Sequence, residues 1–209
     1  MNNTAIRDMR RGEIITAAGD LFSRKGYHGT TMPDIAHAAG ISTGLIYYIF
    51  PSKEDILLAC CENTATLHLT IFERASTLTN PLKRFDAIVR ELYTMLDRES
   101  KMLIIVYKDI ATLQLETRQR ILSMIKNLDN QFIALFQEGQ QTGIFVADIP
   151  ELSVLAANVL GLGHMWALQK TWHFAPQISL DDYISAQLDY FHAQLVRQHT
   201  HSGERDATE

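Results

Sequence analysis

The sequence has little cysteine and no long apolar run. Its two cysteines, Cys60 and Cys61, are adjacent, and neighbouring side chains on a helix point in different directions. We therefore expect no disulfide framework, and a reducing cytoplasm fits this composition. Uninterrupted apolar runs such as Met102 to Tyr107 are too short to span a bilayer, and residues 1–11 lack the apolar stretch of a signal peptide. We therefore expect a cytoplasmic protein without a membrane partner.

A general excess of basic residues is also lacking. The chain has 19 Lys and Arg against 24 Asp and Glu, a net charge of −5. Residues 1–53 hold six basic and four acidic side chains, a net of +2, so the remainder carries −7. A modestly basic N-terminal part on an acidic body fits local contact with DNA phosphates and little non-specific binding. Solvated helix faces explain so small an asymmetry equally well.

Motifs for catalysis and metal binding are missing as well. The sequence contains no phosphate loop, no HExxH, no GxSxG and no readable triad, so we do not expect an enzyme. Cys61 and His68 are seven residues apart, which places them about 10 Å apart along a helix, too far for two ligands of one ion. We expect neither a metal nor a cofactor.

Helical periodicity is what the sequence does contain, and no segment shows sustained strand alternation. The first helix spans about residues 4–25, with Ile14, Ala18, Leu21 and Phe22 in one apolar stripe. Further helices are predicted over residues 52–75, 81–96, 103–113, 115–139, 148–169 and 179–197. The pattern predicts an all-α protein. The polar residues 199–209 are predicted to form a disordered tail.

The stretch from Thr31 to Phe50 predicts a helix-turn-helix. Thr31 is a good N-cap, and Gly40 suits the left-handed conformation that ends a first short helix. Ser42 or Thr43 caps a second short helix before Pro51. A tight helix pair with glycine in its turn is a form that can place its second helix in the major groove of DNA.

The residues around this stretch resemble the N-terminal domain of the TetR/AcrR family of bacterial repressors. The resemblance covers about the first quarter of the chain. It rests on Ala17, Ala18, Leu21, Phe22, Gly26, Tyr27, Thr30, Thr31, Ile35, Ala36, Gly40, Ile41, Ser42, Tyr47, Phe50, Ser52, Lys53 and Glu54. One departure is Ile49, which stands where the family often has His or Tyr. The resemblance implies a DNA-binding domain over residues 1–51 and a helical domain for ligand binding and dimerisation over residues 52–198.

The resemblance also implies the residues that contact DNA. Thr31, Tyr47 and Lys53 match positions that usually touch the DNA backbone, although a capping threonine and a surface lysine would look the same. Facing outward beside the base edges are Ser42, Thr43, Gly44, Leu45 and Tyr48. Leu45 suits a thymine methyl, or is an exposed leucine without a role. The implied partner is a double-stranded operator.

Aromatic and polar residues among the long helices suggest a chamber for a small hydrophobic effector. The candidates are Tyr93, Tyr107, Phe132, Phe136, His164 and Trp166. For each of these residues, ordinary packing in the core or at an interface is an equally good interpretation. Residues 98–121 loosely resemble effector domains of acyl-CoA-responsive members of the family, and drug-like hydrophobic compounds are the competing ligand class.

The last two long helices carry apolar stripes, and family members usually form a four-helix dimer contact here. The expected homodimer interface consists of Leu155, Val159, Gly163, Ile184, Leu188 and Phe191. An intramolecular core stripe would look the same in sequence. The sequence thus predicts a ligand-responsive transcriptional regulator, and a helical small-molecule binding protein without sequence-specific DNA binding is the alternative.

Overall fold

The computed structural model describes residues 3–146, 151–174 and 177–196, and these residues contain helices and no strand. The helices in chain order are α1 (Asn3–Lys25), α2 (Met32–Ala38), α3 (Thr43–Ile49), α4 (Lys53–Ala75), α5 (Pro81–Arg98), α6 (Ser100–Asp109), α7 (Leu115–Gln141), α8 (Leu152–Gln169) and α9 (Leu180–Leu195). A 3₁₀ turn, η1 (Ile110–Thr112), follows α6, and a π-helical turn, η2 (Lys170–Phe174), follows α8. The predicted all-α class is confirmed.

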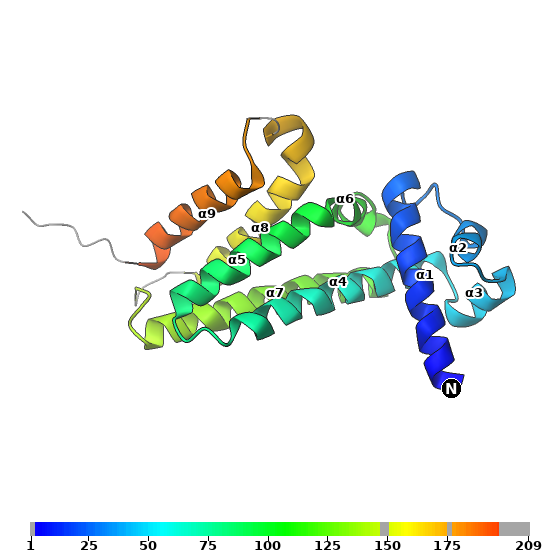
Figure 1. Cartoon of the computed structure of the whole chain (residues 1–209), viewed down its shortest axis with the longest axis horizontal. Helices are drawn as coiled ribbons and strands as arrows, with labels where there is room; N and C mark the ends of the chain where they lie inside the picture. Colours follow the sequence, from blue (N-terminus) through cyan, green and yellow to red (C-terminus); the bar gives the residue numbers. More distant parts are fainter. Residues whose placement is uncertain (1–2, 147–150, 175–176, 197–209) are drawn as a thin grey trace, which may run out of the picture.

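The helices form a small head and a longer body. In Figure 1, α1, α2 and α3 lie together at one end, and α4 leads from them along the body beside α7. Helix α5 returns next to α4, and in this view α8 and α9 lie above α5, with α8 also in contact with α6 and α7. Helix α4 therefore begins in the head and ends at the far end of the body.

The apolar core of the head continues into the body. Ile14, Phe22, Ile35 and Ile46 are each fully buried in it. The same cluster takes in the first two turns of α4, from Ile56 to Cys60, together with side chains of α6 and α7. The boundary predicted at residues 51 and 52 falls at the start of α4, and apolar packing crosses it without interruption.

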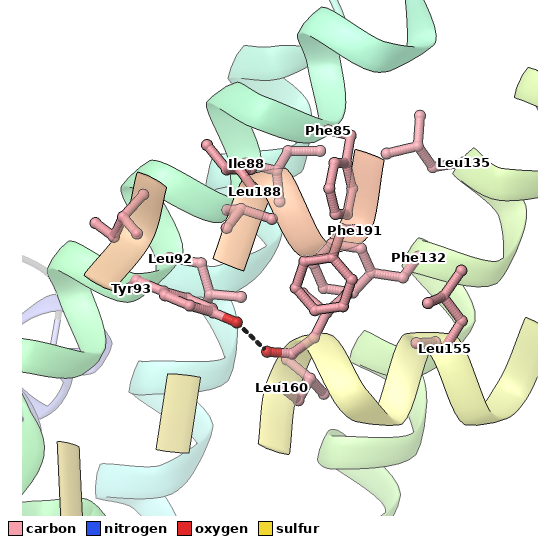
Figure 2. Packing of buried hydrophobic residues seen from close by; sticks show 14 of the residues in the cluster. Phe85, Ile88, Leu92, Tyr93, Phe132, Leu135, Leu155, Leu160, Leu188 and Phe191 are labelled. Carbon is pink, nitrogen blue, oxygen red and sulfur yellow. Dashed lines mark hydrogen bonds between the residues drawn. The ribbon is translucent and has the colours of Figure 1, made fainter. Parts of the chain in front are cut away.

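A second core holds the body together through aromatic rings. Phe85 of α5 lies edge-on to Phe191 of α9 at a centroid distance of 5.6 Å, and it also contacts Phe132 and Phe136 of α7. Figure 2 shows the rings of Phe85, Phe132 and Phe191 between α5, α7, α8 and α9. Burying aromatic side chains of this size contributes a large share of the hydrophobic stabilisation of a domain.

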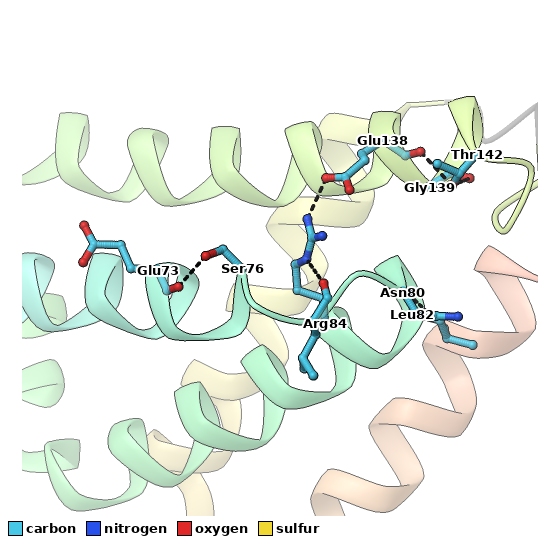
Figure 3. Close-up of polar contacts among 9 residues, drawn as sticks. Glu73, Ser76, Asn80, Leu82, Arg84, Glu138, Gly139 and Thr142 are labelled. Carbon is cyan, nitrogen blue, oxygen red and sulfur yellow. Dashed lines mark hydrogen bonds and ion pairs between the residues drawn. The ribbon is translucent and has the colours of Figure 1, made fainter.

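Polar contacts close the far end of the body, where α4 turns into α5. The Asn80 side chain accepts hydrogen bonds from the first N–H groups of α5, and Pro81 occupies the position where a missing N–H costs nothing. The Arg84 guanidinium donates to the Leu78 carbonyl and, at 2.6 Å, to the Glu138 carboxylate of α7 (Figure 3). These contacts fix the α4–α5 turn against α7.

Three predicted segments differ from the structure or lie outside it. The helix predicted over residues 103–113 begins earlier, at Ser100, and ends at Asp109, because η1 and the extended backbone of Leu113 stop it. The predicted helix start at residues 148–150 and the predicted disordered tail at residues 199–209 lie outside the described residues.

The residues expected at a dimer interface are buried inside this chain. Ile184, Leu188 and Phe191 of α9 are at most 3% exposed, and they join Leu155 and Val159 of α8 in the body core. A Cβ atom on Gly163 would lie 2.7 Å from the Tyr93 ring of α5, so this glycine allows a close approach within the chain. The six positions therefore face their own protomer, and the surfaces open to a second copy are the opposite faces of α8 and α9.

Helix α8 is unusual because both of its faces are apolar. Together with η2 it is long and apolar enough to cross a membrane by length and composition alone, with a mean hydropathy of 1.2. Its inner face packs in the body core, as does the core helix of a soluble protein. Its outer face exposes Val154 and Met165 at 53% and 40%. The outer face is the part of α8 that the described residues leave uncovered.

Candidate DNA-binding face and ligand cavity

The helix-turn-helix is built from short-range caps. Thr31 Oγ1 accepts from the Asp34 N–H while the Asp34 carboxylate accepts from the Thr31 N–H, a reciprocal capping box at the start of α2. Gly40 has φ of +66°, the left-handed conformation that ends α2. The Ser42 side chain caps α3 by accepting from the Leu45 N–H at 3.2 Å. These contacts fix where α2 begins and ends and where α3 begins.

One face of α3 is open to solvent. Ile46 and Ile49 are buried in the head, whereas Tyr47 and Tyr48 are 49% and 73% exposed. Thr43 and Gly44 are exposed beside them, and a Cβ on Gly44 would meet no heavy atom within 4 Å. Among the predicted DNA-contacting residues, these four lie on the open face.

The other predicted contacts have intramolecular partners. The Thr31 and Ser42 side chains are exposed but serve as the caps of α2 and α3. Leu45 is half-buried against the core of the head. Contact with DNA at these positions stays a prediction.

Lys53 occupies a different environment from the one expected of a surface lysine. Its ammonium donates to the carbonyl oxygens of Tyr27 and Thr30, at 2.7 and 2.9 Å, and lies 4.3 Å from the centre of the Tyr27 ring. Partial burial lowers the pKa of Lys53, and the carboxylate of Asp109 opposes that shift. The lysine ties the start of α4 to the turn between α1 and α2. Its predicted phosphate contact is untested.

Two arginines of α1, which are not among the predicted DNA contacts, flank α3. The Arg7 guanidinium lies 5.9 Å from the centre of the Tyr48 ring, and that of Arg11 lies 4.5 Å from the Phe50 ring. Cation–π contact of this kind holds positive charge beside the open face of α3. The run of arginines near the N-terminus was the available signal, but only the crossing of α1 over α3 brings it to this face.

A cavity of about 110 Å³ lies in the body near the head. Helices α4 to α8 all contribute to it, through side chains such as Ala65, Leu96, Leu103, Met124 and Leu160. Its lining is almost wholly apolar. An apolar cavity with a few polar groups is the usual form of a small-molecule site.

The polar side chains that line this cavity include those of Tyr107, His164 and His68, with Thr64 and Glu99 beside them. The Tyr107 hydroxyl lies 2.9 Å from Nδ1 of His164, and burial lowers the pKa of His164 to about 4. In the tautomer protonated at Nε2, Nδ1 of His164 accepts from the tyrosine hydroxyl; in the other tautomer, its Nδ1–H donates to the tyrosine oxygen. Burial together with the nearby His164 also lowers the pKa of His68 to about 4, and its buried Nε2 has no hydrogen-bond partner among the described residues. The cavity is thus lined by two neutral imidazoles, and Nε2 of His68 is available to hydrogen-bond a ligand.

The structure separates the predicted ligand residues into two groups. Tyr107 and His164 line the cavity. Tyr93 is fully buried and donates to the Val159 carbonyl at 2.7 Å (Figure 2), while Phe132 and Phe136 pack among the rings of the body core. Trp166 donates from Nε1 to Asp97 at 2.9 Å. These four residues have core partners and do not line the cavity. Sequence reasoning missed His68, whose signal was its place with Cys61, Thr64 and Ala65 on one face of α4.

The cavity and the head are joined through α6 and the turn after it. Helix α6 supplies Tyr107 to the cavity, and two residues later Asp109 lies 3.2 Å from Nε2 of His28 in the head. The Gln114 N–H donates to the Glu54 carboxylate at the start of α4, at 2.9 Å. A displacement of α6 would therefore move contacts on the head.

Comparison with known proteins follows the same division of the chain. A model of the bacterial regulatory proteins of the tetR family matches residues 14–60, and a model of the tetracyclin repressor-like C-terminal domain matches residues 78–167. The first range covers most of the head and the start of α4, and the second runs from the α4–α5 turn into α8.

Relatives match over most of the chain. The HTH-type transcriptional regulator HbdR of Aromatoleum sp. (strain CIB) is 31% identical over 86% of this chain and 77% of its own. The fatty acid metabolism regulator protein of Bacillus subtilis (strain 168) is 26% identical over 77% of this chain and 81% of its own. A crystal structure of AibR in complex with isovaleryl coenzyme A and operator DNA has a TM-score of 0.70, with 24% identity over 87% of this chain and 97% of AibR. That structure is similar in fold.

Proposed function

The chain belongs to the TetR family of bacterial regulatory proteins, and from this premise we propose that it is a ligand-responsive repressor. It binds a palindromic operator as a homodimer in the cytoplasm, and a small hydrophobic effector releases it. The observation that carries the proposal is the connection of an open α3 face, through α4 and α6, to an apolar cavity.

The proposed DNA contacts lie on α3 and its surroundings. Tyr47 and Tyr48 offer hydroxyl groups and ring edges, and Thr43 with Gly44 lets the first turn of α3 approach the base edges closely. Arg7 and Arg11 bring positive charge next to this helix, where phosphates flank the groove. Together these groups support recognition of one operator half-site per head.

The proposed dimer uses the outer faces of α8 and α9. Val154, Ala157, Gly161 and Met165 form an exposed apolar stripe at helical spacing on α8. Tyr190 of α9 is 48% exposed on the corresponding outer face. A contiguous apolar surface of this kind marks an interaction site, and the open space around Gly161 allows a partner helix to approach.

The proposed effector is an acyl thioester of coenzyme A with a short or compact acyl group. An apolar cavity of about 150 Å³ takes up benzene, so a cavity of about 110 Å³ accommodates a short branched chain and not a long one. The likeness in fold to AibR, which was crystallised with isovaleryl coenzyme A and operator DNA, supports this class. A drug-like apolar compound is the competing effector.

The proposed DNA recognition is tested by selecting operators from random double-stranded DNA with the purified chain. We expect an inverted repeat whose half-site centres lie about 34–36 Å apart, one helical turn, or a multiple of that distance. Failure to enrich any sequence, combined with tight binding of isovaleryl coenzyme A, would favour a helical binding protein without sequence-specific DNA recognition.

The proposed switch is tested with a reciprocal pair of titrations on the selected operator. Isovaleryl coenzyme A should lower operator affinity by about 5–150-fold, and operator DNA should weaken its binding by the same factor. A compound with equal affinity for free and operator-bound protein shifts nothing. Operator binding unchanged by saturating thioester would exclude it as the effector and leave DNA recognition standing.

A further inference from the structure

A second hollow lies next to the cavity, on the outer surface between α4 and α5. This groove, of about 660 Å³, is much larger than the apolar cavity. Its floor includes Ile71 and Met95, and three arginines line it, Arg74, Arg90 and Arg98. The described residues thus place an apolar pocket and an arginine-lined groove on the same two helices.

The groove has basic side chains available to a ligand in a part of the chain that is acidic overall. Arg74 is paired with Glu91. Arg90 and Arg98 are exposed and form no ion pair with any carboxylate of the described residues. Glu91 and Glu99 are the acidic side chains in the lining, so arginines exceed carboxylates there. Guanidinium groups bind phosphate oxygens in bidentate geometry, which makes arginine the residue suited to phosphate recognition.

The groove and the cavity meet at one end. Glu99 lines both of them. On α4, Leu67 faces the groove and the next residue, His68, faces the cavity; on α5, Met95 and Leu96 are divided in the same way. Arg98 therefore lies at the junction. Arg90 precedes Glu99 by nine residues, which is about 13 Å along a helix with a 1.5 Å rise per residue.

We propose that the α4–α5 groove binds the phosphates of an acyl-coenzyme A whose acyl group occupies the apolar cavity. This inference rests on the proposed effector class and names the surface that receives its nucleotide end. In coenzyme A esters, an extended pantetheine arm separates the thioester from the diphosphate. With the acyl group in the cavity, this arm would lie along the groove and bring the diphosphate toward Arg90. The nucleotide is too large for the cavity, so it must lie outside it. The adjoining groove contains the arginine side chains that can bind its phosphates. Free carboxylic acids lack this second half of the ligand.

Two thioesters with the same acyl group test the proposal by calorimetric titration. Isovaleryl coenzyme A carries phosphates, whereas S-isovaleryl-N-acetylcysteamine carries the thioester without them. In the double variant Arg90→Gln/Arg98→Gln, affinity for the coenzyme A ester should fall at least about tenfold, because charge-assisted hydrogen bonds to phosphate are lost. Affinity for the phosphate-free thioester should stay within about twofold, since the apolar cavity is unchanged.

A matched control lies on the same helix. Lys83 is exposed on α5 and does not line the groove, so Lys83→Gln removes one positive charge without touching the proposed site. It should leave both affinities unchanged. Increasing salt should weaken binding of the coenzyme A ester to the wild type and have little effect on the double variant, since phosphate contacts are screened.

The outcomes distinguish the groove from the effector class. Equal affinity of wild type and double variant for isovaleryl coenzyme A would overturn the groove and leave the effector class in place. An equal loss for both thioesters would also overturn it, since the arginines would then act through the fold. Binding of neither thioester to the wild type would exclude the effector class and the groove together, while operator selection would still report on DNA binding.

Discussion

At the scale of single residues, Lys53 shows how a side chain in a DNA-binding motif can have a structural partner. Two of the three hydrogens on its ammonium are directed at carbonyls of the turn between α1 and α2. Those carbonyls lie near the end of α1 and the start of α2, so the lysine connects three helices of the head. A hydrogen-bonded charge in a partly buried position contributes more to stability than an exposed ion pair does.

Replacing this lysine should therefore lower the stability of the fold and have little effect on the salt dependence of operator binding. We expect Lys53→Met to lower the free energy of unfolding by roughly 1–3 kcal/mol, because two carbonyls lose a charged donor. The exposed Lys25, 3.7 Å from Asp34, is the control, and Lys25→Met should change stability little. Thermal unfolding and the salt slope of operator binding are the two measurements. If stability were unchanged and the log–log salt slope of operator binding fell by about 0.9, Lys53 would instead contact a DNA phosphate.

The two cavity histidines make stability depend on pH in a defined window. Both have a pKa of about 4 in the folded chain against an ordinary value of 6.5. The unfolded chain therefore takes up protons first as the pH falls. Their effect on stability is absent above pH 6.5, grows as the pH falls toward 4 and is constant below 4.

Replacing both histidines with leucine should flatten this dependence. Between pH 7 and pH 5 the wild type should lose on the order of 1 kcal/mol more per histidine than His68→Leu/His164→Leu does. Denaturant unfolding at the two pH values measures the difference. His37→Leu on α2, an exposed position outside the cavity, is the control and should keep the wild-type dependence. A double variant with the same loss as the wild type would mean that the imidazoles take up protons in the folded chain.

At the scale of elements, α8 combines two apolar faces with different partners. Its inner face, with Val159 and Gly163, packs against its own protomer. Its outer face, with Ala157 and Gly161, is open. A monomer rarely leaves such a stripe uncovered, and the two glycines differ in their surroundings even though they are only two residues apart.

Charge on the outer face should separate the protomers while leaving each one folded. Gly161→Arg places its side chain in open space within the chain, so we expect a folded monomer and a dimer dissociation constant raised at least about 100-fold by an unpaired buried charge. Sedimentation at micromolar concentration measures this. Gly12→Arg on α1, also in open space, is the matched control and should remain dimeric. A Gly161→Arg dimer of wild-type affinity would place the interface elsewhere.

At the scale of the whole molecule, α4 and α6 join the cavity to the head. Helix α4 starts with Lys53 in the head and lines the cavity two to four turns later. Helix α6 lines the cavity and places Asp109 beside His28. Two heads must fit two major grooves at once, so a small displacement of these helices is sufficient to lose the second half-site.

Filling the cavity should remove the response without removing DNA binding. Ala65 lines the cavity from α4, and Ala65→Leu adds apolar volume where the acyl group would lie. We expect at least a tenfold weaker response to isovaleryl coenzyme A, because overpacking a site of about 110 Å³ excludes the ligand. Operator affinity without ligand should stay near that of the wild type. Ala111→Leu on the exposed turn η1 is the control, and an unchanged response of Ala65→Leu would place the effector outside this cavity.

The sequence by itself determined the features that depend on neighbours along the chain. Thr31 and Ser42 cap α2 and α3 through contacts three residues away, Gly40 ends α2, and helical periodicity fixed the all-α class. Only the tertiary structure decided which apolar stripe faces inward, because burial within a protomer and burial between protomers leave the same pattern at Leu155 and Phe191. It also decided that Lys53 hydrogen-bonds to carbonyls 23 and 26 residues away in the sequence, and which side chains line the cavity. Spacing along one helix reports which residues share a face, but the element opposite that face is set by how the whole chain packs.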